Sequence, residues 1–125
     1  MKKIIINSAL IILLAVVFSA CSNKDEDQSN IKIAILHTND MHAKIDNMAK
    51  LAAYKHEVEE QYDHVLLVSA GDIFSGNPVV DVYRKKGYPM IDLMNRLEYD
   101  LTAIGNHEFD YGQEVLAKRM KQADF

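Results

Sequence analysis

The chain has 125 residues, of which 49% are hydrophobic and 26% charged, and its formal net charge is −4. This length allows one small domain at most, and the composition excludes a wholly disordered chain. Residues 21–125 carry a net charge of −6, because Lys2 and Lys3 are the only charged residues before them, and we therefore expect no binding of a nucleic-acid polymer.

The first element in chain order has the pattern of a signal peptide over residues 1–20. Two lysines precede a short apolar segment, and small residues then precede Cys21, which is the only cysteine. The stretch "FSAC" (18–21) resembles the lipobox of bacterial lipoproteins. This resemblance implies cleavage before Cys21, lipidation of that residue and stable membrane anchoring. An uncleaved membrane anchor is the alternative, although the apolar stretch is short for a full span.

Residues 21–30 form the second predicted segment. The stretch "SNKDEDQSN" (22–30) contains no apolar residue and is dense in charge, which predicts a disordered tether. The acidic run after Cys21 also resembles the export signal of surface lipoproteins in the Bacteroides–Flavobacterium group. We therefore expect an exported lipoprotein, anchored in the outer membrane or on the surface of a Gram-negative cell.

From Ile31 onward, strand patterns alternate with helix patterns. Apolar runs of strand length predict β-strands, and apolar residues at helical spacing predict helices. In chain order the segments are a strand at 31–37, a helix at 44–62, a strand at 64–70, helices at 78–86 and 89–99, a strand at 101–105 and a helix at 112–123. The order β-α-β-α-α-β-α, with strands apolar on both faces, predicts the α/β class with helices packed on a parallel sheet.

Polar clusters follow all three predicted strands. Asp40 and His42 follow the first strand, Asp72 follows the second, and Asn106 and His107 follow the third. Because ligands bind at the carboxyl ends of parallel strands in open α/β sheets, we expect these side chains to converge at one edge. Three independent turns would have no reason to carry ligand-type residues at the same edge.

Each cluster taken alone has a simpler interpretation. Asp40 could cap the following helix, and Gly71-Asp72 and Gly105-Asn106 could be ordinary turns. Glu108 could be a solvated carboxylate. Ser75 has no adjacent general base, and we do not expect it to be a nucleophile.

Together the clusters suit a pair of divalent ions such as Zn²⁺, Mn²⁺, Fe or Co. Asp40 and His42 can share one ion, Asp72 can bridge two, and Asn106 can bind the second. Two ions about 3.5–4 Å apart can activate water and stabilise displacement at phosphorus. His107 can then donate a proton to the substrate, and Asp110 can orient its ring and raise its pKa.

The stretches "ILHTNDMHAK", "GDIFSG" and "GNHEFDYG" resemble the first three signature blocks of the 5′-nucleotidase group of calcineurin-like binuclear metallophosphoesterases. The resemblance runs from about Ile33 to the last residue. It implies the same metal ligands (Asp40, His42, Asp72 and Asn106) and a catalytic dyad of His107 and Asp110. It also implies a four-layer α/β/β/α sandwich, of which residues 31–125 would be the N-terminal and incomplete part. Ala43 stands where the family usually has glycine.

The resemblance implies hydrolysis of nucleotides outside the cytoplasm, with a nucleotide or another phosphate ester as substrate. The family needs further histidine ligands, and none follows Asp110 in this sequence. The 125 residues alone are therefore expected to be inactive. A truncated, non-catalytic lipoprotein that keeps half of the metal site is one alternative. Others are a cyclic-nucleotide phosphodiesterase, a UDP-sugar hydrolase and a sulfur-compound hydrolase.

Overall fold

A computed structural model describes residues 30–125 of the chain. The predicted signal peptide, the lipidated Cys21 and nearly all of the tether lie outside the described residues. Residues 31–125 form one compact unit. In chain order its elements are β1 (Ile33–Thr38), a 3₁₀ turn η1 (Ile45–Asn47), α2 (Met48–Glu59), β2 (His64–Ser69), α3 (Pro78–Asp81), α4 (Tyr88–Arg96), β3 (Leu101–Thr102), a 3₁₀ turn η2 (His107–Phe109) and α5 (Gln113–Met120). This order confirms the predicted β-α-β-α-α-β-α succession.

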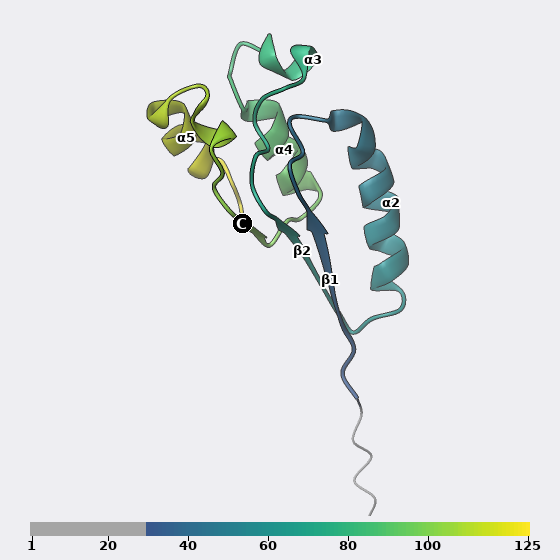
Figure 1. Ribbon diagram of the computed structural model, residues 1–125. Coiled ribbons are helices and arrows are strands. Elements are labelled where there is room, and N and C mark those ends of the chain that lie inside the picture. Colours follow the sequence, from purple (N-terminus) through teal and green to yellow (C-terminus); the bar gives the residue numbers. More distant parts are fainter. Residues whose placement is uncertain (1–29) are drawn as a thin grey trace, which may run out of the picture. The chain divides into compact units, whose positions relative to one another are not determined.

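The three strands form one parallel sheet in the order β1-β2-β3 (Figure 1). β1 pairs with β2 over its whole length, from Ile33 opposite His64 to Thr38 opposite Ser69. β3 adds a short pairing, with Leu101 opposite Val68. The α/β class and the parallel sheet are therefore confirmed, and the carboxyl ends of the strands meet at one edge.

The main core lies on the face of the sheet that carries Leu67. This residue is fully buried and packs with side chains of α4, α5 and the connecting loops (Ile73, Phe74, Ile91, Met94, Tyr99 and Leu116). A second buried cluster joins the loop after β1 to α2, α3 and α4 (Ala43, Met48, Val80 and Met90). Both clusters lie beneath the loops that follow β1 and β2, and they hold those loops in place.

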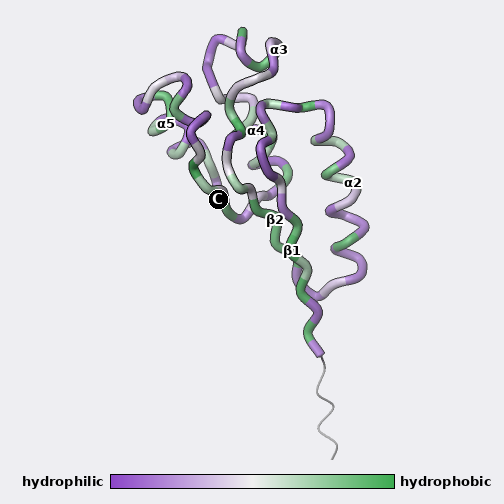
Figure 2. The backbone as a smooth tube through the Cα atoms, in the orientation of Figure 1, coloured by the Kyte–Doolittle hydropathy of each residue, from purple (hydrophilic) through white to green (hydrophobic). Residues whose placement is uncertain are grey.

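The other face of the sheet is exposed in the described residues. Along β1 the odd-numbered residues are exposed, with Ile33 at 58% and Ile35 at 65%, and Leu66 on β2 is 41% exposed. Hydrophobic residues nevertheless line β1 and β2, as Figure 2 shows. The sequence indicated apolar residues on both faces, but the helices bury only one. The four-layer sandwich stays a prediction, since residues 30–125 hold a single sheet.

Several predicted boundaries were wrong. The helix expected at 44–62 is the η1 turn followed by α2, which ends at Glu59. The helix expected at 78–86 ends at Asp81, after a start capped by the Asn77 side chain on Val79 N–H. Its last turn closes with bonds from Val82 N–H to Pro78 C=O and from Tyr83 N–H to Val80 C=O, after which the chain leaves the helix. Gly87 does not end that helix but precedes α4, with a φ of 69°.

The third strand is also shorter than predicted, covering Leu101–Thr102 and not 101–105. The last backbone hydrogen bond between β2 and the chain after β3 runs from Ala103 N–H to Ser69 C=O at 2.9 Å. Beyond it the chain turns, because the Gly105 N–H bonds to the side chain of Glu108 at 2.6 Å. No helix of residues 30–125 combines the length and the apolar character that a membrane span requires.

Candidate metal centre

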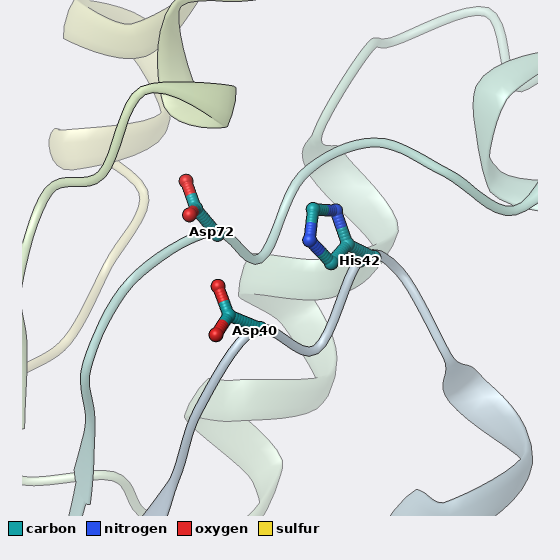
Figure 3. A group of neighbouring side chains, drawn as sticks. All are labelled: Asp40, His42 and Asp72. Carbon is teal, nitrogen blue, oxygen red and sulfur yellow. The ribbon is translucent and has the colours of Figure 1, made fainter.

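The loops after β1 and β2 bring three ionisable side chains together. Asp40, His42 and Asp72 each offer one ligand atom, and these atoms lie within 4.8 Å of one another. Figure 3 shows the two carboxylates and the imidazole gathered around the same space. The sequence predicted that these side chains converge, and the structure places them so. Asp40 does not cap the following helix, since Lys44 is the residue that precedes η1.

All three residues have left-handed backbone conformations. Their φ angles are 47° for Asp40, 45° for His42 and 53° for Asp72. Each costs roughly 1–3 kcal/mol and persists only where its surroundings enforce it. Two hydrogen bonds between the loops do so, from His42 N–H to Asp72 C=O at 2.9 Å and from Ala43 N–H to Ile73 C=O at 3.0 Å. The hydrogen bonds between the two loops therefore fix the backbone from which these three side chains extend.

Ala43 belongs to the same strained segment. It is fully buried and has a φ of 56°, a conformation that glycine adopts at little cost. This geometry explains why glycine is suited to the position. The methyl group of Ala43 instead packs in the cluster with Met48, Val80 and Met90.

The third loop reaches the cluster through His107. Its backbone N–H donates to Asp72 Oδ1 at 2.9 Å. Its ring lies edge-on to the ring of His42, with centroids 4.6 Å apart. Asn106 immediately precedes His107 and is exposed. The backbone thus brings residue 106 beside Asp72, while the role of its amide as a ligand stays a prediction.

His107 and Asp110 form a hydrogen-bonded pair. His107 Nδ1 lies 2.8 Å from Asp110 Oδ2, and this bond raises the pKa of the imidazole. Ser75 donates its hydroxyl to the same carboxylate oxygen. The Ser75 bond and then the His107 bond lower the pKa of Asp110. Asp110 therefore stays ionised and fixes the orientation of the ring, which leaves Nε2 free for chemistry.

Ser75 has a role that the sequence did not indicate. Its hydroxyl is a partner of Asp110 from the loop after β2, 35 residues earlier in the chain. Nothing in the local pattern around Ser75 predicts a contact so distant in sequence. The expectation that no base lies adjacent to Ser75 was wrong, because its hydroxyl donates to the Asp110 carboxylate. The lowered pKa of Asp110 makes that carboxylate a weak base, so the bond orients Asp110 and does not make Ser75 a nucleophile.

The interpretation of Glu108 as a solvated carboxylate was wrong. Glu108 is only 2% exposed. Its two oxygens accept hydrogen bonds from three backbone N–H groups, on Asp72, Ile73 and Gly105. Burial of a carboxylate is tolerated here because the charge is satisfied by several donors.

The electrostatics of the cluster suit a cation. The backbone N–H of His107 lowers the pKa of Asp72. Two carboxyl groups and an imidazole so close together match the ligands that divalent transition metals prefer. A groove of about 520 Å³ opens beside Asp40 and includes Lys44 and Lys50 in its wall. The donor set therefore fits a divalent ion next to a space that a substrate could enter.

Comparison with known proteins identifies relatives over the same region. The family model described as calcineurin-like phosphoesterase matches residues 33–122. The trifunctional nucleotide phosphoesterase protein YfkN of Bacillus subtilis is 39% identical over 103 residues, which is 80% of this chain and 7% of that protein. A 5′-nucleotidase of Vibrio cholerae is 33% identical over 134 residues, which is 98% of this chain and 24% of that protein.

A solved structure agrees with the fold. The crystal structure of YfkN from Bacillus subtilis superimposes with a TM-score of 0.65 at 35% identity, over 73% of this chain and 34% of the compared chain. The present chain thus spans 7% of the Bacillus subtilis protein and 24% of the Vibrio cholerae protein. The matched part includes all three loops of the candidate site, since it extends from residue 33 to residue 122.

Proposed function

The chain belongs to the calcineurin-like phosphoesterase family, and from this premise we propose that it serves metal-dependent hydrolysis of phosphate esters. Nucleotides are the favoured substrates, in a reaction of the 5′-nucleotidase type. The names of the relatives from Bacillus subtilis and Vibrio cholerae support this choice. The observation that carries the proposal is the cluster of Asp40, His42 and Asp72, whose ligand atoms lie within 4.8 Å of one another.

Asp40 and His42 would hold one divalent ion, Asp72 would bridge to a second, and Asn106 would bind that second ion. Zn²⁺, Mn²⁺, Fe and Co all accept this mixture of carboxylate, imidazole and amide ligands. When bound, such ions supply positive charge to the phosphoryl oxygens and activate water for attack on phosphorus. The net negative charge of the chain is then no obstacle to an anionic substrate.

His107 would act as the proton donor. Its Nδ1 is engaged by Asp110 at 2.8 Å, so Nε2 is the nitrogen that can give a proton to the leaving oxygen of the ester. Ser75 and Asp110 would hold the ring in this orientation from two different loops. The raised pKa of His107 favours the protonated form that a general acid requires.

A second candidate is a non-catalytic product that keeps half of the metal site. The number of ligands favours it for residues 30–125 on their own. Two complete metal shells need roughly eight to twelve ligands including water. The clustered residues Asp40, His42 and Asp72 offer three ligand atoms.

Two measurements separate the candidates. The product of the complete reading frame is assayed for phosphate release from a nucleoside 5′-monophosphate with and without Mn²⁺, alongside the Asp72→Ala variant. We expect turnover that depends on Mn²⁺ and is lost in the variant, while the exposed Asp124→Ala control keeps it. Calorimetry with Mn²⁺ on the 125-residue chain then counts ions. Turnover retained in Asp72→Ala would refute the assignment, and tight uptake of two ions by the chain alone would refute the half-site alternative.

We also propose export and membrane anchoring through lipidated Cys21, on the sequence pattern alone. Residues 1–20 would be removed as the signal peptide and residues 21–30 would serve as the tether. Metabolic labelling with a radioactive fatty acid tests this in a Gram-negative host. We expect label in the wild-type protein and none in Cys21→Ser, and equal labelling of both would contradict the proposal.

A further inference from the structure

The loops after β2 and β3 are joined by reciprocal hydrogen bonds, in which a carboxylate of each loop accepts from the backbone of the other. Asp72, in the first loop, accepts a hydrogen bond from the backbone of the second loop, at His107 N–H. Glu108, in the second loop, accepts hydrogen bonds from the backbone of the first, at Asp72 N–H (2.9 Å) and Ile73 N–H (2.6 Å). Each loop therefore holds the acidic side chain of the other.

Glu108 also closes its own loop. Its Oε2 accepts from Gly105 N–H at 2.6 Å in addition to Asp72 N–H, while Oε1 accepts from Ile73 N–H. The ion pairs found in residues 30–125 do not include Glu108. Its charge is thus balanced by backbone dipoles, in the manner of successive N–H groups that form an anion-binding nest.

This arrangement enforces the unusual backbone of Asp72. The φ angle of 53° turns the N–H groups of residues 72 and 73 towards one side, where both meet Glu108. A side chain in this conformation is strained and needs support from its surroundings. Glu108 supplies that support at the residue whose carboxylate lies in the metal cluster.

The two loops are packed too closely for a side chain at Gly71 or Gly105 to lie between them. A Cβ atom at Gly71 would lie 2.8 Å from Gly105 N, and a Cβ atom at Gly105 would lie 2.7 Å from Asp72 Cγ. Side chains at these positions cannot fill the gap between the loops. The carboxylate of Glu108 instead joins the two loops by accepting hydrogen bonds from their backbones, and the residue is 2% exposed.

We propose that Glu108 is a positioning residue for the metal site, which fixes Asp72 by holding the backbone amides of residues 72, 73 and 105. This inference rests on the proposed function, because it gives Asp72 the role of a metal ligand. Loss of such supporting partners typically weakens metal binding about 10- to 100-fold. Glu108 does not touch the reacting groups in this role and acts only through Asp72.

The informative substitution is Glu108→Gln. Glutamine has the same shape, but its NH₂ group cannot accept a hydrogen bond and would face one or more backbone N–H donors. We expect the loop around Asp72 to lose its fixed conformation while the sheet remains intact. Glu108→Asp keeps the charge with a shorter side chain, and we expect it to restore part of the metal affinity.

The test measures two quantities on the full 125-residue chain. Electron paramagnetic resonance of free Mn²⁺ gives the metal affinity, and amide hydrogen exchange in metal-free protein gives the protection of residues 72, 73 and 105. In Glu108→Gln we expect Mn²⁺ affinity to fall about 10- to 100-fold. Protection should fall at these three amides and remain along β1 and β2.

Val58→Ala serves as the control for a loss of stability alone. Val58 is 7% exposed on α2, outside the candidate metal cluster. The proposal is overturned if Glu108→Gln keeps the Mn²⁺ affinity of the wild type, if Val58→Ala weakens it equally, or if exchange at the three amides is unchanged. Absence of Mn²⁺ binding by the wild-type chain would instead show that these residues hold no ion on their own, and the exchange data would still decide whether Glu108 holds the loop.

Discussion

The backbone N–H of His107 donates a hydrogen bond of 2.9 Å to Oδ1 of Asp72, 35 residues earlier in the chain. This bond joins the loops after β2 and β3 directly at the candidate metal cluster. It occupies one carboxylate oxygen of Asp72 and lowers the pKa of the group. Asp72 is therefore held in an orientation and a charge state that suit a bridging metal ligand.

Replacing Asp72 by asparagine tests its charge at nearly constant shape. Asparagine can still accept the bond from His107 N–H through its carbonyl oxygen, but it offers no negative charge to a cation. We expect Mn²⁺ affinity to fall by more than about 100-fold, beyond the effect typical of a supporting residue. Isothermal titration calorimetry measures the affinity, with the exposed Asp124→Asn as the control. An unchanged affinity in Asp72→Asn would show that the cluster is not the metal site.

His107→Ala separates proton donation from metal binding. The variant keeps the backbone N–H that supports Asp72 and removes only the ring. We expect the kcat of the complete reading-frame product towards a nucleoside 5′-monophosphate to fall about 10²- to 10⁴-fold, the usual contribution of a general acid. Mn²⁺ affinity should stay within about threefold of the wild type, because the proposed ligand set does not include His107. A parallel loss of metal affinity would make His107 a ligand and contradict its proposed role.

The convergence of the loops could be predicted from sequence because it follows from topology. Three apolar segments separated by helices require a parallel sheet, and parallel strands place their carboxyl ends at one edge. Asp40, His42 and Asp72 each follow such a segment directly, so a pattern local to each strand was sufficient. The same reasoning placed His107 beside them.

The support of these residues could not be predicted in the same way. Asp40, His42 and Asp72 adopt positive φ angles, which Asp and His reach more often than other non-glycine residues but too rarely for the sequence to predict them. Glu108 lies in a stretch rich in polar groups, which suggested solvation. Its burial depends on N–H groups contributed by a loop 35 or 36 residues away. Such partners become visible only when the two loops are placed together.

Gly105→Ala tests the close contact of the two loops. The φ angle of Gly105 is not in the left-handed region, so the effect of a methyl group is steric. The added Cβ would lie 2.7 Å from Asp72 Cγ and 3.0 Å from Asp72 N, which forces the loop to move. We expect a loss of about 1–3 kcal/mol in the free energy of unfolding, together with weakened Mn²⁺ binding.

Gly112→Ala is the matched control for this variant. Gly112 has a φ of 85°, and a Cβ atom there meets nothing within 4 Å. Its ψ of 156° places it in a region that essentially only glycine occupies, so its cost is backbone strain alone, about 1–3 kcal/mol, with Mn²⁺ affinity unchanged. Urea unfolding and Mn²⁺ titration of both variants provide the comparison. Equal Mn²⁺ affinities in the two variants would contradict the role assigned to the loop contact.

Tyr99→Phe tests a buried hydroxyl below the loop after β1. Tyr99 is 4% exposed, and its hydroxyl lies 3.1 Å from Thr38 Oγ1. Removing this hydrogen bond should lower the free energy of unfolding by about 0.5–1.5 kcal/mol at pH 7. Urea unfolding measures it, and Tyr54→Phe on the exposed face of α2 is the control.

The same residue should make the stability sensitive to alkaline pH. Burial raises the pKa of Tyr99 in the folded state, so the phenol ionises more readily in the unfolded chain. Its contribution to stability is present below the unfolded pKa of about 10 and is lost as the pH rises towards the higher folded value. We expect Tyr99→Phe to lose less stability than the wild type between pH 9 and about 10.5. Identical pH profiles would contradict the burial of the ionisable group.

Leu67→Ala and Ile35→Ala together test the asymmetry of the sheet. Leu67 is fully buried under α4 and α5, and its truncation should cost about 2–5 kcal/mol of the free energy of unfolding. Ile35 lies on the neighbouring strand but is 65% exposed, so its truncation should change that free energy by no more than about 0.5 kcal/mol. Urea unfolding of both variants of the 125-residue chain measures the difference. A loss of unfolding free energy in Ile35→Ala similar to that in Leu67→Ala would mean that the exposed face is covered in solution. Only burial of Ile35 against other groups would make its truncation so destabilising.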